Sequence, residues 1–119
     1  MFIGGDVKLL VVGSRSIEKY DIGKHIPKET TMIITGGADG VDTLAEKYAD
    51  EKRISKLILR PRYELYGKSA PLKRNEEMVR LCDAALIIWD GSSRGTLHTI
   101  NFAQKLGKNI ILINLINTT

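Results

Sequence analysis

The 119-residue chain has few of the residues that cross-link or anchor small proteins: one cysteine, two histidines and no apolar run of membrane-spanning length. A lone Cys82 excludes an intrachain disulfide and is interpreted as a core residue. With only His25 and His98 as further soft ligands, and no paired spacing, we expect no metal site and no cofactor. No charged segment precedes an apolar one at the N-terminus, so we expect a cytoplasmic protein without a membrane partner.

The length and charge of the chain limit its number of domains and the kinds of partner it can bind. A chain of this size buries about two-thirds of its unfolded surface, which predicts one domain over residues 1–119. The formal net charge is +4, yet residues 52–80 hold nine Lys or Arg against three Glu, giving +6 there and −2 elsewhere. Such a segment is typical of a solvated surface, or faces a phosphate-bearing ligand or nucleic acid. Basic and aromatic residues do not alternate, so nucleic acid is the less favoured partner.

Five short apolar runs divide the chain, at residues 8–12, 31–35, 54–59, 84–89 and 109–114. Their continuous apolar character is typical of strands covered on both faces of a parallel sheet. Helix-compatible stretches separate them, and parallel neighbours need right-handed crossovers. The sequence therefore predicts a Rossmann-like, doubly wound α/β fold, with five strands in the order 3-2-1-4-5 and helices on both faces.

The sequence signals for the expected helices differ in strength. Apolar residues at helical spacing predict a helix after Gly40, with Asp39 and Asp42 as a capping pair. Residues 18–27 predict a weaker, shorter helix.

A second long helix is expected to begin at Pro71 and to bury a stripe made of Leu72, Met78, Val79 and Cys82. A third is expected over 96–106, ending at Gly107 as a C-terminal cap. Residues 60–69 form the longest connection without obvious secondary structure, and Tyr63 or Tyr66 there either stacks on a base or pins the loop.

Three of the apolar runs end in glycine- and serine-rich turns that are candidate phosphate-binding loops. They supply most of the predicted ligand-binding residues: Gly13, Ser14, Arg15, Thr35, Gly36, Gly37, Ala38, Asp39, Gly40, Asp42, Asp90, Gly91, Ser92, Arg94, Gly95 and Thr96. Amides at a helix N-terminus lack intrahelical partners, and glycine lets an anion approach the backbone closely. One such turn is equally explained as a tight structural turn. Three that meet at the switch point of the sheet predict a composite anion site.

Four side chains extend this prediction. Arg15 and Arg94 are candidate anion clamps, because a guanidinium holds a phosphate by two parallel hydrogen bonds; the alternative is two exposed loop arginines. Asn75 falls within the apolar stripe of the second long helix, so its amide bonds a neighbouring loop or a ligand. Arg74 lies on the flank of this stripe, so we expect it to reach the same loop or ligand as Asn75. No Ser-His-Asp, Cys-His or metal-binding set is present, so no catalytic residue is assigned.

Several of these motifs occur in the same order in a known superfamily. The segments concerned are 13–15, 35–42, 66–68, 74–78 and 89–96. Together they resemble the SLOG superfamily, which includes the DNA-processing protein DprA and the LOG phosphoribohydrolases, and within it the YspA-like, cpYpsA-related group. The resemblance covers nearly the whole chain. It implies a Rossmann-like domain that binds a nucleotide or nucleotide-derived ligand as a sensor or effector module.

The resemblance leaves two alternative functions and departs from the LOG enzymes at two points. LOG enzymes carry a Pro-Gly-Gly-x-Gly-Thr-x-x-Glu motif; Gly95 and Thr96 match its Gly-Thr, but Thr99 stands at the glutamate position and residues 89–92 replace its start. A threonine cannot serve as a carboxylate base, which favours binding over hydrolysis. The alternatives are a LOG-like hydrolase of N-glycosidic or phosphate bonds, using Asp39, Asp42 or Asp90, and a DprA-like single-stranded DNA binder. A homo-oligomer is compatible with either.

Overall fold

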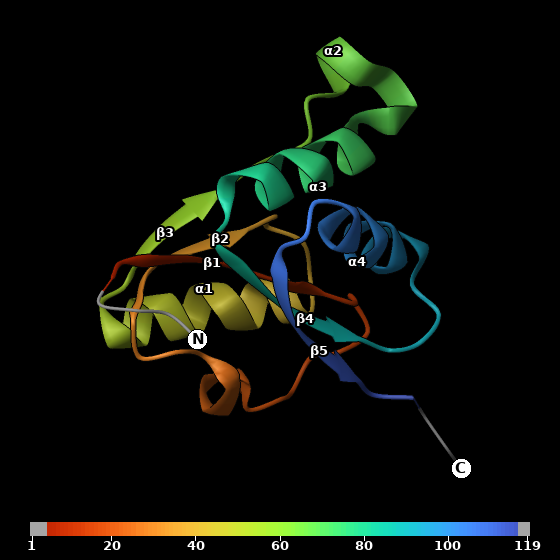
Figure 1. The fold of residues 1–119 in the computed structure, drawn as a ribbon. Coiled ribbons are helices and arrows are strands. Elements are labelled where there is room, and N and C mark those ends of the chain that lie inside the picture. Colours follow the sequence, from red (N-terminus) through yellow and green to blue (C-terminus); the bar gives the residue numbers. More distant parts are fainter. Residues whose placement is uncertain (1–4, 117–119) are drawn as a thin grey trace.

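The computed structural model describes residues 5–116, in which five parallel strands alternate with helices (Figure 1). The strands are β1 (Val7–Gly13), β2 (Thr30–Thr35), β3 (Ser55–Ile58), β4 (Ala84–Trp89) and β5 (Asn109–Asn114). The longer helices are α1 (Val41–Lys52), α3 (Ala70–Leu81) and α4 (Arg94–Lys105), and the short helical turns are η1 (Ile22–His25), α2 (Tyr63–Tyr66) and η2 (Gly67–Ser69). The sheet order β3-β2-β1-β4-β5 confirms the predicted order and fold class.

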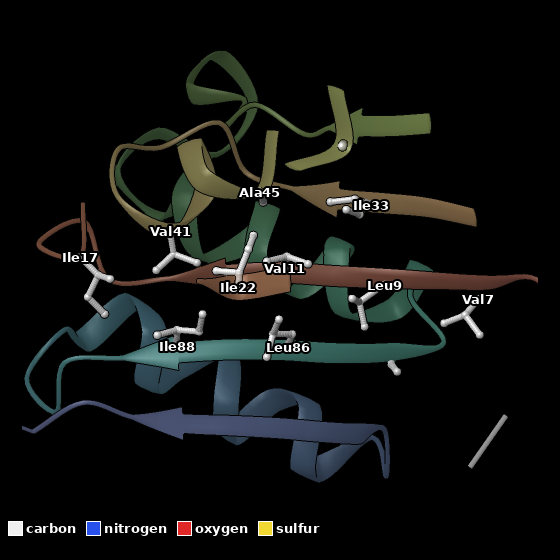
Figure 2. Close-up of a cluster of buried hydrophobic side chains, with 12 residues drawn as sticks. Val7, Leu9, Val11, Ile17, Ile22, Ile33, Val41, Ala45, Leu86 and Ile88 are labelled. Atoms are coloured by element: carbon white, nitrogen blue, oxygen red, sulfur yellow. The ribbon is translucent and has the colours of Figure 1, made fainter. Parts of the chain in front are cut away.

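Helices cover both faces of the sheet. Leu9 and Val11 of β1 point to the face covered by α1, where they join a buried cluster with Val41 (Figure 2). Leu10 and Val12 point to the opposite face and pack with residues of α3 and α4. Successive side chains of a strand point to opposite faces, so a continuous apolar strand supplies two cores at once.

The expectation of burial on both faces is wrong for the two edge strands. Leu57 of β3 is 39% exposed and Leu112 of β5 is 40% exposed, whereas residues 84–88 of β4 are buried. An edge strand has a neighbour on one side only, and the covering helices lie over the middle strands. The sequence pattern records the apolar residues but not which strands lie outermost.

Three local predictions also need correction. The weak helix expected over 18–27 is a four-residue 3₁₀ turn, η1. The segment 60–69, expected to be a loop, contains the single turns α2 and η2, which are too short to give a periodic pattern. Leu72 is 39% exposed rather than part of the buried stripe.

Two other local predictions are confirmed. Gly107 adopts a positive φ of 68° after α4, and its amide donates to the Gln104 carbonyl oxygen, as a C-terminal glycine cap does. Cys82 is buried, and this burial raises the pKa of its thiol. No helix within residues 5–116 combines the length and apolarity needed to cross a bilayer.

Candidate anion-binding site

The carboxyl ends of β1 and β2 and the first turns of α3 and α4 surround a cavity of about 130 Å³. Eight predicted ligand-binding residues line it: Gly13, Arg15, Ala38, Asp42, Arg74, Asn75, Gly95 and Thr96. Its walls also contain Val12, Pro71, Leu72, Ser93 and Thr99. Four separate stretches of the chain thus meet at the switch point of the sheet, where open α/β sheets bind ligands.

The turn after β1 is held by contacts within the protein. A Cβ on Gly13 would collide with the Ile88 carbonyl oxygen and with Val41, so glycine is needed there for packing. Ser14 is buried, and its Oγ accepts a hydrogen bond from the Asp90 amide at 3.0 Å. Arg15, by contrast, is exposed and lines the cavity, so it is the residue of this turn that is free to meet a ligand.

The turn after β2 surrounds a carboxylate of the protein itself. Oδ2 of Asp42 accepts hydrogen bonds from the amides of Gly36, at 3.0 Å, and Ala38, at 3.3 Å. The expected capping pair is therefore wrong: Gly40 occupies the N-cap position of α1, and Asp42 reaches back into the turn. Two of the amides predicted to hold a phosphate are already satisfied by Asp42.

Two glycines of this turn are also explained by internal packing. A Cβ on Gly37 would collide with the Arg60 guanidinium, and one on Gly40 would collide with the backbone of Ser14 and Arg15. Both glycines have positive φ, 71° and 75°. Their conformation brings the turn against β1 and Arg60, so glycine here does not by itself indicate a ligand.

Asp42 is the one carboxylate in the cavity wall among residues 5–116, and it is 4% exposed. Burial raises its pKa, while the hydrogen bonds from the Ala38 and Gly36 amides and the charge of Arg74 act in the opposite direction. A raised carboxyl pKa in a cavity is a feature of functional sites as well as of buried structural groups.

Arg74 links α3 to the ends of two strands. Its Nη1 donates to the carbonyl oxygens of Gly36, at 2.7 Å, and Leu59, at 3.1 Å, and its Nε donates to Asn75 Oδ1 at 2.8 Å. The loop bond expected of Asn75 is thus made by Arg74, which Asn75 orients. Burial lowers the pKa of Arg74; Asp42 and Tyr63 oppose this effect, and Arg60 and Arg15 add to it.

The turn after β4 is organised around Asp90. Its Oδ1 accepts from the amides of Ser92 and Ser93, both at 2.9 Å, and its Oδ2 accepts from Ser16 Oγ at 2.7 Å. These hydrogen bonds, that of Ser92 first, hold the pKa of Asp90 well below its usual range. Asp90 therefore shapes the turn and is not part of the cavity wall.

The first turn of α4 is the open anion-facing element of the cavity. Ser93 is its N-cap, and the Ser93 Oγ accepts from the Thr96 amide at 3.3 Å. A Cβ on Gly95 would meet no atom of residues 5–116 within 4 Å, so these residues leave the space beside this turn free. No acidic residue lies in the turn. The helix dipole and the amides before Thr96 can therefore act on an anion placed here.

The remaining predicted residues lie behind or beside the cavity rather than in its wall. They are Ser14, Thr35, Gly36, Gly37, Asp39, Gly40, Asp90, Gly91, Ser92 and Arg94. Thr35 is fully buried, and its Oγ1 has no hydrogen-bond partner among the described residues. Ser93 lies in the cavity wall but is not in the predicted ligand-binding set, although a serine three residues before Thr96 is a recognisable N-cap signal. Thr99 lies in the cavity wall, and its hydroxyl donates to the Gly95 carbonyl oxygen at 3.1 Å.

Comparison with known proteins gives one informative match. The Gene 61 protein of Mycobacterium phage D29 is 36% identical to this chain over 86 residues, which cover 67% of this chain and 69% of the phage protein. The chain belongs to the family of this phage protein. Neither a protein-family model nor a solved structure matches this chain.

Proposed function

We propose that this protein binds a nucleotide or nucleotide-derived ligand, with a phosphate group between Arg15, Arg74 and the first turn of α4. The observation that carries the proposal is the excess of positive charge in this cavity, where, among the described residues, Arg15 and Arg74 face the single carboxylate of Asp42. Within residues 5–116, no carboxylate lies within 4.0 Å of either guanidinium, and the open helix N-terminus adds a partial positive charge. The resemblance to the SLOG superfamily supports a nucleotide as the anion and a sensor or effector role.

Replacing Arg15 with Ala tests the phosphate contact. Because a hydrogen bond to a charged group contributes about 1.5–3 kcal/mol, we expect nucleoside monophosphate affinity to fall by roughly 10- to 150-fold. Isothermal titration of adenosine, guanosine, cytidine and inosine monophosphates would measure the change. Lys105→Ala, at the exposed end of α4, is a control of equal charge and should bind as the native chain does. Equal affinity of the Arg15→Ala and native proteins would contradict the proposal.

A binding module should not turn its ligand over. The native protein, incubated with the same monophosphates, is expected to release no free base or ribose 5-phosphate. Thr99 offers no carboxylate and its hydroxyl is engaged by Gly95, and a missing general acid–base group removes about 10²- to 10⁴-fold of rate. Robust base release would favour the LOG-like alternative instead and point to Asp42, because its carboxylate lies in the cavity wall.

A further inference from the structure

A second cavity, of about 240 Å³, lies between the segment that follows β3 and one face of α3. Figure 1 shows this segment running past α3 to reach α2. We call this cavity the basic groove, and its cationic lining residues are Arg60, Arg62, Lys73, Arg74 and Arg80. Glu77 is its one carboxylate among the described residues.

Three of the five cations of the basic groove lie on α3, with Glu77 of the same helix between Lys73 and Arg80. Lys73, Arg74 and Arg80 lie three, four and ten residues after Ala70, and all four line the groove from α3. At 1.5 Å of rise per residue, the stretch from Lys73 to Arg80 spans about 10 Å along the helix. This span is longer than a single phosphate needs, so the cations at its two ends suit separate anionic groups on either side of Glu77.

Three of these side chains are held by uncharged partners. Arg60 Nη1 donates to the Gly37 carbonyl oxygen at 3.1 Å, Arg74 donates to the strand ends described above, and the Arg80 guanidinium lies 5.0 Å from the Phe102 ring centroid. No carboxylate of residues 5–116 lies within 4.0 Å of any cation of the groove. Like charges fixed near one another repel, and an anion between them would remove that repulsion.

Arg74 lines both the anion cavity and the basic groove, so the two are neighbours across one guanidinium. We infer that the ligand carries at least two phosphate groups, one in the cavity and a further one in the basic groove, as a nucleoside polyphosphate or bisphosphate does. This inference rests on the proposed function, because it assumes that the first phosphate occupies the cavity. On this inference, a nucleoside monophosphate fills the cavity but places no phosphate in the basic groove.

The test compares AMP, ATP and adenosine 3′,5′-bisphosphate by isothermal titration at one fixed salt concentration. The native chain should bind ATP or the bisphosphate at least about tenfold more tightly than AMP, since the extra phosphate gains charged hydrogen bonds. Preference for ATP would indicate a phosphate chain, and preference for the bisphosphate would indicate a second phosphate on the ribose. The double variant Arg62→Ala/Lys73→Ala, at two exposed positions, should reduce the affinity ratio to about one.

The matched control is Lys52→Ala/Lys105→Ala, which removes the same charge from positions outside the basic groove and should keep the native ratio. AMP binding that depends on Arg15, with no gain for either longer ligand, would overturn this inference and leave the proposed function standing. Absence of binding to all three nucleotides would overturn both. Binding of a single-stranded oligonucleotide that needs Arg62 and Lys73 but not Arg15, and that ATP does not displace, would also overturn it and assign the groove to nucleic acid.

Discussion

Replacing Asp42 with Ala is expected to lower the free energy of unfolding by about 2–5 kcal/mol, since each buried donor left without an acceptor costs about 1–3 kcal/mol. The substitution removes the acceptor of the Gly36 and Ala38 amides. It also removes the negative charge that partly offsets the effect of burial on the Arg74 guanidinium. Urea denaturation followed by circular dichroism would measure the change.

Asp50→Ala is the matched control, because it removes a carboxylate of the same helix. Asp50 is exposed and pairs with Lys56 at 2.9 Å, and a surface ion pair contributes only about 0–1 kcal/mol. If both variants lost the same small amount, Asp42 would not hold the turn after β2.

The pH dependence of stability should separate the contribution of the Asp42 charge from the contribution of its hydrogen bonds. Because burial raises the pKa of Asp42, the folded chain still holds this proton at a pH where the unfolded chain has lost it. The stability that this group contributes therefore falls as pH rises from the ordinary aspartate pKa to the raised one. Asp42→Asn keeps an oxygen acceptor and should abolish this component. Identical pH profiles of the unfolding free energy for the native and Asp42→Asn proteins would contradict the raised pKa of Asp42.

Replacing Arg74 with Ala should have the second largest effect, a loss of about 2–4 kcal/mol of stability together with the loss of nucleotide binding. Among residues 5–116, this side chain alone joins α3 to the carbonyl oxygens of Gly36 and Leu59, so its removal leaves two acceptors there without that donor. Chemical denaturation and titration with ATP would measure the two losses separately.

The neighbouring position provides the stability control. Lys73 is exposed, and Lys73→Ala should change the free energy of unfolding by less than about 0.5 kcal/mol. Arg74→Lys keeps the positive charge but not the planar fork that reaches three acceptors, so it should recover only part of the stability. Full recovery by lysine would show that the charge, rather than the hydrogen-bond geometry, holds the strand ends.

The sequence by itself determined the architecture. Continuous apolar runs such as 84–89 have the length and composition of buried parallel strands, and their alternation with helices leaves few topologies open. The order 3-2-1-4-5 then brings the turns after β1, β2 and β4 to the same edge of the sheet, so the place of the cavity also follows from local patterns. Thr96 and Thr99 fall in its wall because their helical spacing turns them toward the sheet.

Only the tertiary structure decided what each site residue does. Gly36 and Arg74 are 38 residues apart in the chain, and their hydrogen bond depends on how α3 packs over the sheet. In the same way, Asp42 satisfies amides that the sequence pattern offers to a phosphate, and Gly37 makes room for Arg60. A glycine turn looks the same in sequence whether a ligand or the protein's own side chain fills it, because both require close approach to the backbone.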